Sequence, residues 1–76
     1  MITVKLYGLL RLDYGIKEKQ LEAATVKQVL KNLESCGIPE KELKSCVILV
    51  NGQSTNRRSR LTDGDTVVIM SPVAGG

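Results

Sequence analysis

Residues 25–39 read TVKQVLKNLESCGIP and carry the clearest local signal in the chain. Thr25 and Gln28 have the spacing of a helix capping box. Apolar residues then recur at i, i+3, i+4 and i+7, which share one helix face: Val26, Val29, Leu30 and Leu33. Gly37 can adopt the left-handed conformation that ends a helix, and Pro39 prevents its continuation. We therefore predict one amphipathic helix from Val26 to about Cys36.

Two strands are predicted before this helix. Ile2, Val4 and Leu6 alternate with polar residues, which is typical of a half-buried strand. Residues 9–15 form a stretch that is too short for a helix and ends in turn residues, so we predict a hairpin connection there. Residues 16–22 are rich in Lys and Glu and predict a returning edge strand, because such charges discourage pairing with other chains.

Further strands are predicted after the helix. Residues 40–45 can form one more helical turn. The unbroken apolar run Val47–Val50 predicts a strand covered on both faces, and Asn51–Gly52 predicts a tight hairpin because both residues tolerate positive φ. A short edge strand over residues 53–55 and a polar loop follow. A Thr-Asp-Gly-Asp turn then leads to a last apolar strand at 66–70, which we expect to be central.

The order of these elements predicts an α+β fold. Only a mixed sheet of four to five strands, with the one main helix packed across one face, buries every apolar stripe. This arrangement is the β-grasp, or ubiquitin-like, fold, and we assign it to residues 1–72. A chain of 76 residues holds one domain and buries only about 60% of its unfolded surface, so it has little room for an enclosed active site.

Composition excludes several classes of function. The chain has no histidine, which removes the usual general base and every Ser-His or Cys-His nucleophile pair, so we do not expect an enzyme. Cys36 and Cys46 lack metal-type spacing, and no metal site is predicted. Both thiols are read as small apolar residues, with a redox disulfide or a sulfur-accepting thiol as the alternative.

The sequence lacks the features of membrane-spanning and secreted proteins. Its longest apolar run is far shorter than the roughly 20 residues that span a bilayer, and the first residues lack a secretory pattern, so we expect a cytoplasmic protein.

Arg57, Arg58 and Arg60 give one loop a basic character. Aromatic content is only 3%, so no stacking platform for nucleic acid is predicted. This loop is read as solvated, or else as a feature that steers the chain toward an acidic protein surface.

The stretch Val73-Ala74-Gly75-Gly76 carries the predicted site. Glycine lacks a Cβ, so two in succession can pass through a narrow protein channel. A terminal carboxylate of pKa roughly 3.5 is ionised at neutral pH and inert toward nucleophiles, so chemistry at Gly76 requires outside activation. We predict a flexible tail over residues 73–76 that leaves the sheet at Pro72. The alternative is an ordinary frayed terminus.

The residues that carry a family resemblance lie in the last part of the chain. Leu61-Thr62-Asp63-Gly64-Asp65, the strand after it and Pro72-Val73-Ala74-Gly75-Gly76 resemble the small, sulfur-carrying subunit of molybdopterin synthase and the thiamine sulfur carrier ThiS. The resemblance to this MoaD/ThiS family implies that Gly76 is adenylated and converted to a thiocarboxylate. It also implies that Gly75 allows close approach, and that Val73 and Ala74 fill the entrance of a partner's channel.

The resemblance implies partners rather than bound cofactors. These are a ubiquitin-activating-type adenylyltransferase, which uses ATP, a sulfur donor protein, and the large subunit of molybdopterin synthase or an equivalent sulfur-accepting enzyme. The product is molybdopterin by this reading, with thiamine or another sulfur-containing product as the alternative. Two other classes stay open: a ubiquitin-like modifier joined to lysines through Gly76, and a plain binding domain that uses its sheet surface.

Overall fold

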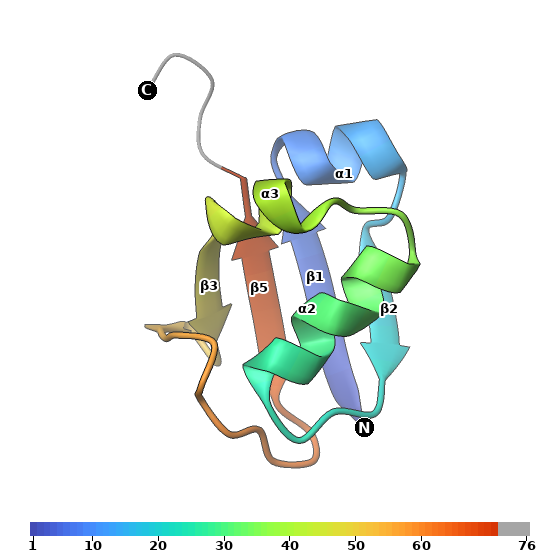
Figure 1. Ribbon diagram of the computed structural model, residues 1–76. Coiled ribbons are helices and arrows are strands. Elements are labelled where there is room, and N and C mark those ends of the chain that lie inside the picture. The colour runs from blue at the N-terminus through green and yellow to red at the C-terminus, as the bar shows by residue number, and fades with distance from the viewer. Residues whose placement is uncertain (72–76) are drawn as a thin grey trace.

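The computed structural model describes residues 1–71, so Pro72 and the predicted tail, residues 73–76, lie outside the described part of the chain. Five strands form a single sheet in the order β2-β1-β5-β3-β4, with three helices between them (Figure 1). The strands are β1 (Ile2–Tyr7), β2 (Glu18–Leu21), β3 (Val47–Val50), β4 (Gln53–Ser54) and β5 (Thr66–Met70). The helices are α1 (Leu9–Tyr14), α2 (Val26–Ser35) and α3 (Glu40–Lys44).

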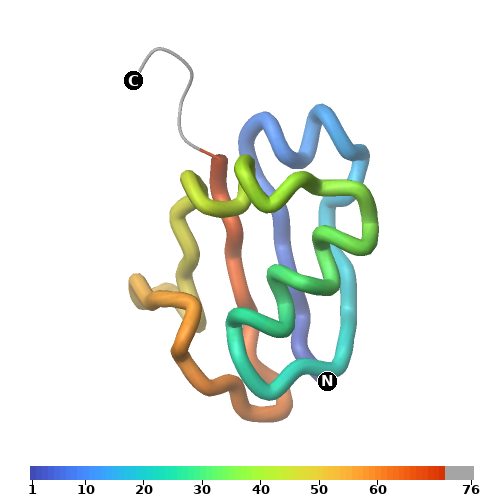
Figure 2. The backbone as a smooth tube through the Cα atoms, in the orientation of Figure 1, coloured from blue at the N-terminus to red at the C-terminus, as the bar shows by residue number. Residues whose placement is uncertain are grey.

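The sheet is mixed, as predicted. β1 and β5 pair in parallel at its centre, whereas β1–β2, β3–β4 and β3–β5 pair antiparallel. Figure 2 shows the first and last of these strands side by side. α2 crosses one face of the sheet (Figure 1), which confirms the predicted β-grasp with one main helix and a central last strand.

The core lies between α2 and the covered face of the sheet. Alternation along the central strands places every second side chain on this face. Val4, Val67 and Ile69 are fully buried there, and Val29 and Leu33 of α2 are fully buried against them. No polar or charged residue among residues 1–71 is buried.

The termini of α2 follow the predicted local signals. Thr25 Oγ1 accepts a hydrogen bond from the Gln28 amide at 3.3 Å. This bond satisfies one of the backbone N–H groups of the first turn that have no partner within the helix. At the other end the amides of Ile38 and Gly37 donate to the carbonyls of Leu33 and Glu34, the pattern of a Schellman motif. The predicted helix therefore begins at Val26 and ends one residue before Cys36.

Replacing the cap residue should weaken the fold measurably. We expect Thr25→Ala to lower the free energy of unfolding by about 1 kcal/mol, because the Gln28 amide loses its side-chain acceptor. Urea unfolding followed by circular dichroism measures this loss. Thr25→Ser keeps the oxygen and is the matched control. An equal loss in both variants would contradict a capping role.

The prediction of a hairpin connection over residues 9–15 is wrong, because this segment forms α1. The helix is short, but contacts with the rest of the domain stabilise it, because Leu10 is buried in the core. Gly15 closes α1 in a left-handed conformation and donates its amide to the Arg11 carbonyl. The strand predicted over 16–22 is correspondingly shorter, and β2 lies at the sheet edge as expected.

The prediction that Val47–Val50 is covered on both faces is also wrong. Ile48 is buried, whereas the side chain of Val47 is 47% exposed and Leu49 is half-buried. The helices cover only one face of the sheet, so an apolar run in β3 leaves part of its side chains facing solvent. The turn after it is confirmed, since Asn51 and Gly52 have φ values of 50° and 83°.

Candidate functional site

The described chain ends at Ser71, directly after β5, which is the root of the predicted tail. The predicted site residues Pro72, Val73, Ala74, Gly75 and Gly76 all lie outside the described residues. The structure defines the surface from which residue 72 continues, at the end of the sheet where α1 and α3 lie (Figure 1).

Ser71 contacts the junction between β1 and α1. Its amide donates to the Tyr7 carbonyl at 3.4 Å, and its Oγ accepts a hydrogen bond from the Leu9 amide at 2.7 Å. Gly8 lies between these two residues with φ 74°, and a Cβ at this position would collide with Ser71 Oγ. Ser71 is thus held by backbone groups of Tyr7 and Leu9, which are distant from it in sequence, so no local sequence pattern predicts this contact.

Exposed apolar side chains surround this root, and we call them the apolar rim. Tyr7 and Val47 flank Met70 across the sheet, and they are 39% and 47% exposed. Leu9 and Leu12 of α1 are 46% and 78% exposed. Exposed apolar groups gathered at one end of a domain are typical of an interaction surface. The segment 9–15 contains three leucines, of which Leu10 is buried while Leu9 and Leu12 contribute to the rim.

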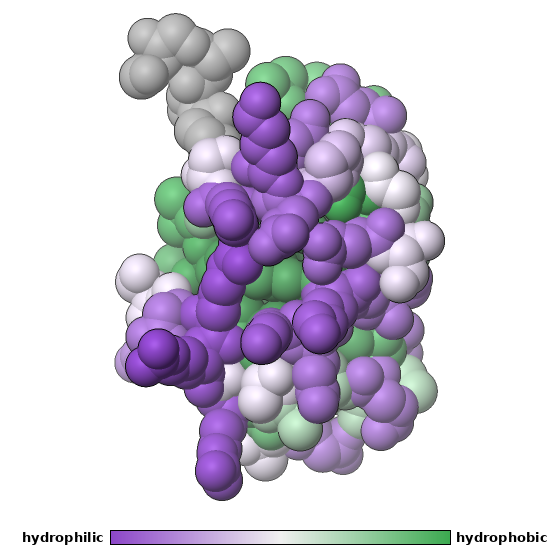
Figure 3. Space-filling model, in the orientation of Figure 1, coloured by the Kyte–Doolittle hydropathy of each residue, from purple (hydrophilic) through white to green (hydrophobic). Residues whose placement is uncertain are grey.

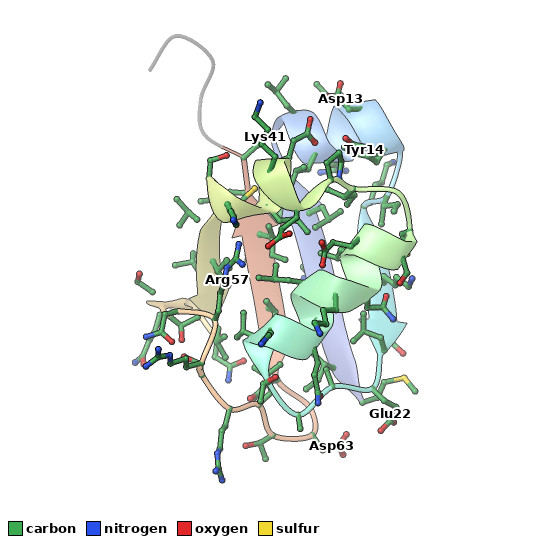
Figure 4. All side chains as sticks on the ribbon, viewed as in Figure 1. Asp13, Tyr14, Glu22, Lys41, Arg57 and Asp63 are labelled. Carbon is green, nitrogen blue, oxygen red and sulfur yellow. The ribbon has the colours of Figure 1, made fainter. Side chains whose placement is uncertain are left out.

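Tyr14 and Glu42 join α1 to α3 beside this end of the sheet. The Tyr14 hydroxyl donates to Glu42 Oε2 at 2.6 Å. Tyr14 is the last residue of α1, and Figure 4 shows it between α1 and α3. The hydrogen bond to the Glu42 carboxylate raises the pKa of Tyr14 to about 12, with smaller contributions from burial and from the negative charges of Glu42 and Asp13.

This raised pKa predicts an alkaline limit to stability. The phenol is protonated in the folded chain up to a higher pH than the ordinary value of 10, so its contribution is fully present below pH 10. We expect that contribution to be lost as pH rises from 10 to about 12. Absorbance titration of tyrosinate in a Tyr7→Phe background measures the Tyr14 pKa. Adding Glu42→Gln should return it toward 10, and an unchanged value would contradict this cause.

Neither cysteine lies in a disulfide. Cys36 is exposed, and its Sγ lies 2.7 Å from Lys19 Nζ. Cys46 is half-buried at the start of β3, and its thiol donates to the Glu42 carbonyl at 3.1 Å. Burial, followed by the nearby Glu42 charge, raises the pKa of the Cys46 thiol. That shift makes Cys46 less reactive as a nucleophile at neutral pH.

Arg57 and Arg58 of the predicted basic loop line a cleft together with the start of α2 and both ends of α3. The cleft has a volume of about 670 Å³, and its charged residues are Lys27, Glu40, Lys44, Arg57 and Arg58. Their four positive charges and one negative charge equal the whole net charge of +3, so the remaining residues are formally neutral together. Hydrophilic side chains dominate this face (Figure 3), and Arg57 extends toward α3 (Figure 4).

Comparison with protein families shows which family the chain belongs to. A model described as the ThiS family matches residues 4–76, which includes the whole tail. The chain belongs to the ThiS family. This is a family of ubiquitin-like sulfur carriers, so the resemblance found in the sequence is confirmed at the level of the family. Comparison with curated proteins found no match.

Solved structures agree with this membership in the ThiS family. Small archaeal modifier protein 1 from Methanosarcina acetivorans is 29% identical, with a TM-score of 0.79 over 99% of this chain and 95% of that one. A chain of the Amycolatopsis orientalis BexX/CysO complex is 28% identical, with a TM-score of 0.76 over 100% of both chains. A chain of the Helicobacter pylori complex of molybdopterin-converting factor subunits 1 and 2 is 24% identical, with a TM-score of 0.74 over 99% and 97%, and supports the fold alone.

No helix within residues 1–71 is long and apolar enough to cross a membrane.

Proposed function

We propose that this protein is a sulfur carrier whose Gly76 carboxylate is adenylated and then converted to a thiocarboxylate. The observation that carries the proposal is the family match, which continues through Gly76 rather than stopping at the folded domain. The surroundings of Ser71 support it, because an apolar rim at the tail root gives a partner enzyme a surface to hold. The proposal takes Gly76 as the last residue of the working protein.

The chemistry follows from the inertness of a carboxylate. A partner adenylyltransferase joins the Gly76 carboxylate to AMP from ATP and releases pyrophosphate, which gives the carbonyl carbon a good leaving group. Sulfide released by a donor protein then attacks this carbon: a C–S bond forms, the C–O bond to AMP breaks, and AMP leaves with that oxygen, so one terminal oxygen is replaced by sulfur. The product sulfur is soft and ionised, and is a better nucleophile than the oxygen it replaces. In this scheme Gly75, Ala74, Val73 and Pro72 lie in the partner's channel.

The carrier donates this sulfur in a second enzyme and turns over no substrate itself. We propose the large subunit of molybdopterin synthase as the first acceptor to test, because residues 61–65 and 72–76 resemble its small partner subunit. A thiamine-type acceptor, or an enzyme that makes another sulfur-containing product, is the alternative, and the ThiS family match supports this wider class. We place both reactions in the cytoplasm, and neither requires a cofactor bound to this chain.

The alternative function is that of a protein modifier. The 29% identity with small archaeal modifier protein 1 from Methanosarcina acetivorans supports this alternative. In that case an amine of a target lysine, instead of sulfur, would attack the adenylated Gly76. Both functions share the activation step, so they differ only in the product.

Intact mass measurement distinguishes these functions. The purified chain is incubated with ATP, a cognate adenylyltransferase and a sulfur donor protein. Exchange of one oxygen for one sulfur supports the carrier function. Isopeptide-linked species without that exchange support the modifier function. A chain that stays unchanged while the same enzymes convert a known carrier removes both.

The basic cleft predicts how the carrier meets its partner. We expect the pair Arg57→Glu and Arg58→Glu to slow association with the adenylyltransferase by about tenfold at low salt, because both changes reverse charges in the cleft, where the excess positive charge lies. The effect should shrink at physiological salt as screening increases. Stopped-flow association measures it. Lys17→Glu with Lys31→Glu changes the net charge equally on other exposed sites, and an equal effect there would contradict a role for the cleft.

A further inference from the structure

The start of α1 depends on a residue from the other end of the chain. The first amides of a helix have no partner within the helix. Gly8 precedes α1 and offers no side-chain cap, whereas the hydroxyl of Ser71, 62 residues away, accepts from the Leu9 amide at 2.7 Å. The α1 cap and the tail root are therefore the same contact.

Two features of this contact show that it is specific. The backbone of Gly8 adopts φ 74° and ψ −146°, a conformation that glycine adopts far more readily than other residues. The absence of a Cβ there also makes room for Ser71 Oγ. Ser71 has one other backbone contact here, its amide to the Tyr7 carbonyl at 3.4 Å, which is long for a hydrogen bond. The hydroxyl bond is the stronger of the two by distance.

We propose that Ser71 is a positioning residue for the tail, and that its hydroxyl fixes the direction in which residue 72 leaves the sheet. This rests on the proposed function, in which a partner enzyme must receive Gly76 in a channel. A tail that starts from a fixed point loses less conformational freedom on binding. The same bond ties that starting point to α1, so a partner that holds Leu9 and Leu12 also receives the tail in a defined place.

The first test uses the isolated protein and measures hydrogen exchange of the Leu9 amide by NMR. We expect Ser71→Ala to speed this exchange by about fivefold, the effect of losing one hydrogen bond of ordinary strength. Ser71→Thr keeps the hydroxyl and should restore protection. Ser35→Ala removes a hydroxyl that bonds within α2 to the Lys31 carbonyl, and should leave Leu9 unchanged. Unchanged Leu9 exchange in Ser71→Ala would overturn the proposal.

The second test measures adenylation kinetics with the cognate adenylyltransferase. We expect Ser71→Ala to raise KM by about fivefold with kcat unchanged, because the enzyme holds the tail equally once it is bound. Ser71→Thr should restore KM, and Ser35→Ala should match the parent chain. If the parent chain is adenylated but KM does not change in Ser71→Ala, the positioning role of Ser71 is contradicted and the proposed function stands. A parent chain that this enzyme does not adenylate removes the proposed function and, with it, the positioning role.

Discussion

A chain that lacks Gly76 is expected to acquire no sulfur under conditions that convert the full chain. Its last carboxylate would belong to Gly75, about 3.8 Å short of the original position, because that is the spacing of consecutive Cα atoms. A misplacement of about 1 Å can reduce an enzymatic rate by about 100-fold. We therefore expect conversion to fall by at least about 100-fold, measured as the fraction of chain that exchanges one oxygen for sulfur.

The fold should survive this deletion, so the loss is assigned to chemistry. The strands and helices that the structure describes lie within residues 1–71, so the deletion removes no residue of any of them. Urea unfolding of the deleted chain should match the full chain and serves as the control. A deleted chain that still gains sulfur would place the sulfur elsewhere. Replacing Cys36 and Cys46 by serine would then show whether a thiol carries it.

A less severe variant distinguishes the effect of tail length from the effect of a side chain at position 76. Gly76→Ala keeps the position of the carboxylate but adds one Cβ, which must fit the partner's channel. We expect conversion to fall less than in the deleted chain, because the reacting carbon still reaches the same depth. Equal loss in both variants would indicate that the absence of a side chain, rather than length, is the dominant requirement.

The parts of the fold that were predictable from sequence have local causes. The stretch from Thr25 to Ile38 contains the cap, the apolar stripe and the Schellman motif of α2, and all of them act within a few residues of each other. The turn at Asn51–Gly52 is similarly self-contained. The positions of this helix and this turn could therefore be predicted without knowing how the sheet is arranged.

The features that were predicted wrongly, or not predicted, depend on residues elsewhere in the chain. α1 exists because Leu10 packs into the core and Ser71 caps Leu9, and neither partner is visible in the segment 9–15. The apolar rim depends on strand register, which brings Tyr7 and Val47 to either side of Met70. The chemistry of Gly76 was predicted from the residue itself and from a family resemblance. The surface that would present Gly76 to a partner required the fold.

Leu33→Ala is expected to cause a large loss of stability. Leu33 is fully buried, and its carbonyl accepts the Ile38 amide at the end of α2. Removing a buried leucine side chain leaves a cavity and typically costs about 2–5 kcal/mol. Domains have only about 5–15 kcal/mol of stability in total, and a small one has less core in reserve. We therefore expect a marginally folded or unfolded chain, with a urea midpoint far below that of the parent protein.

The matched control for this variant is Leu12→Ala, which makes the same chemical change at a site that is 78% exposed. We expect its free energy of unfolding to change by no more than about 0.5 kcal/mol, as is usual for surface substitutions. If the apolar rim contacts the adenylyltransferase, Leu12→Ala should instead weaken that complex. Burial and function would then separate at two leucines of one chain, the buried one needed for folding and the exposed one for docking. Equal destabilisation by the two substitutions would contradict the placement of α1.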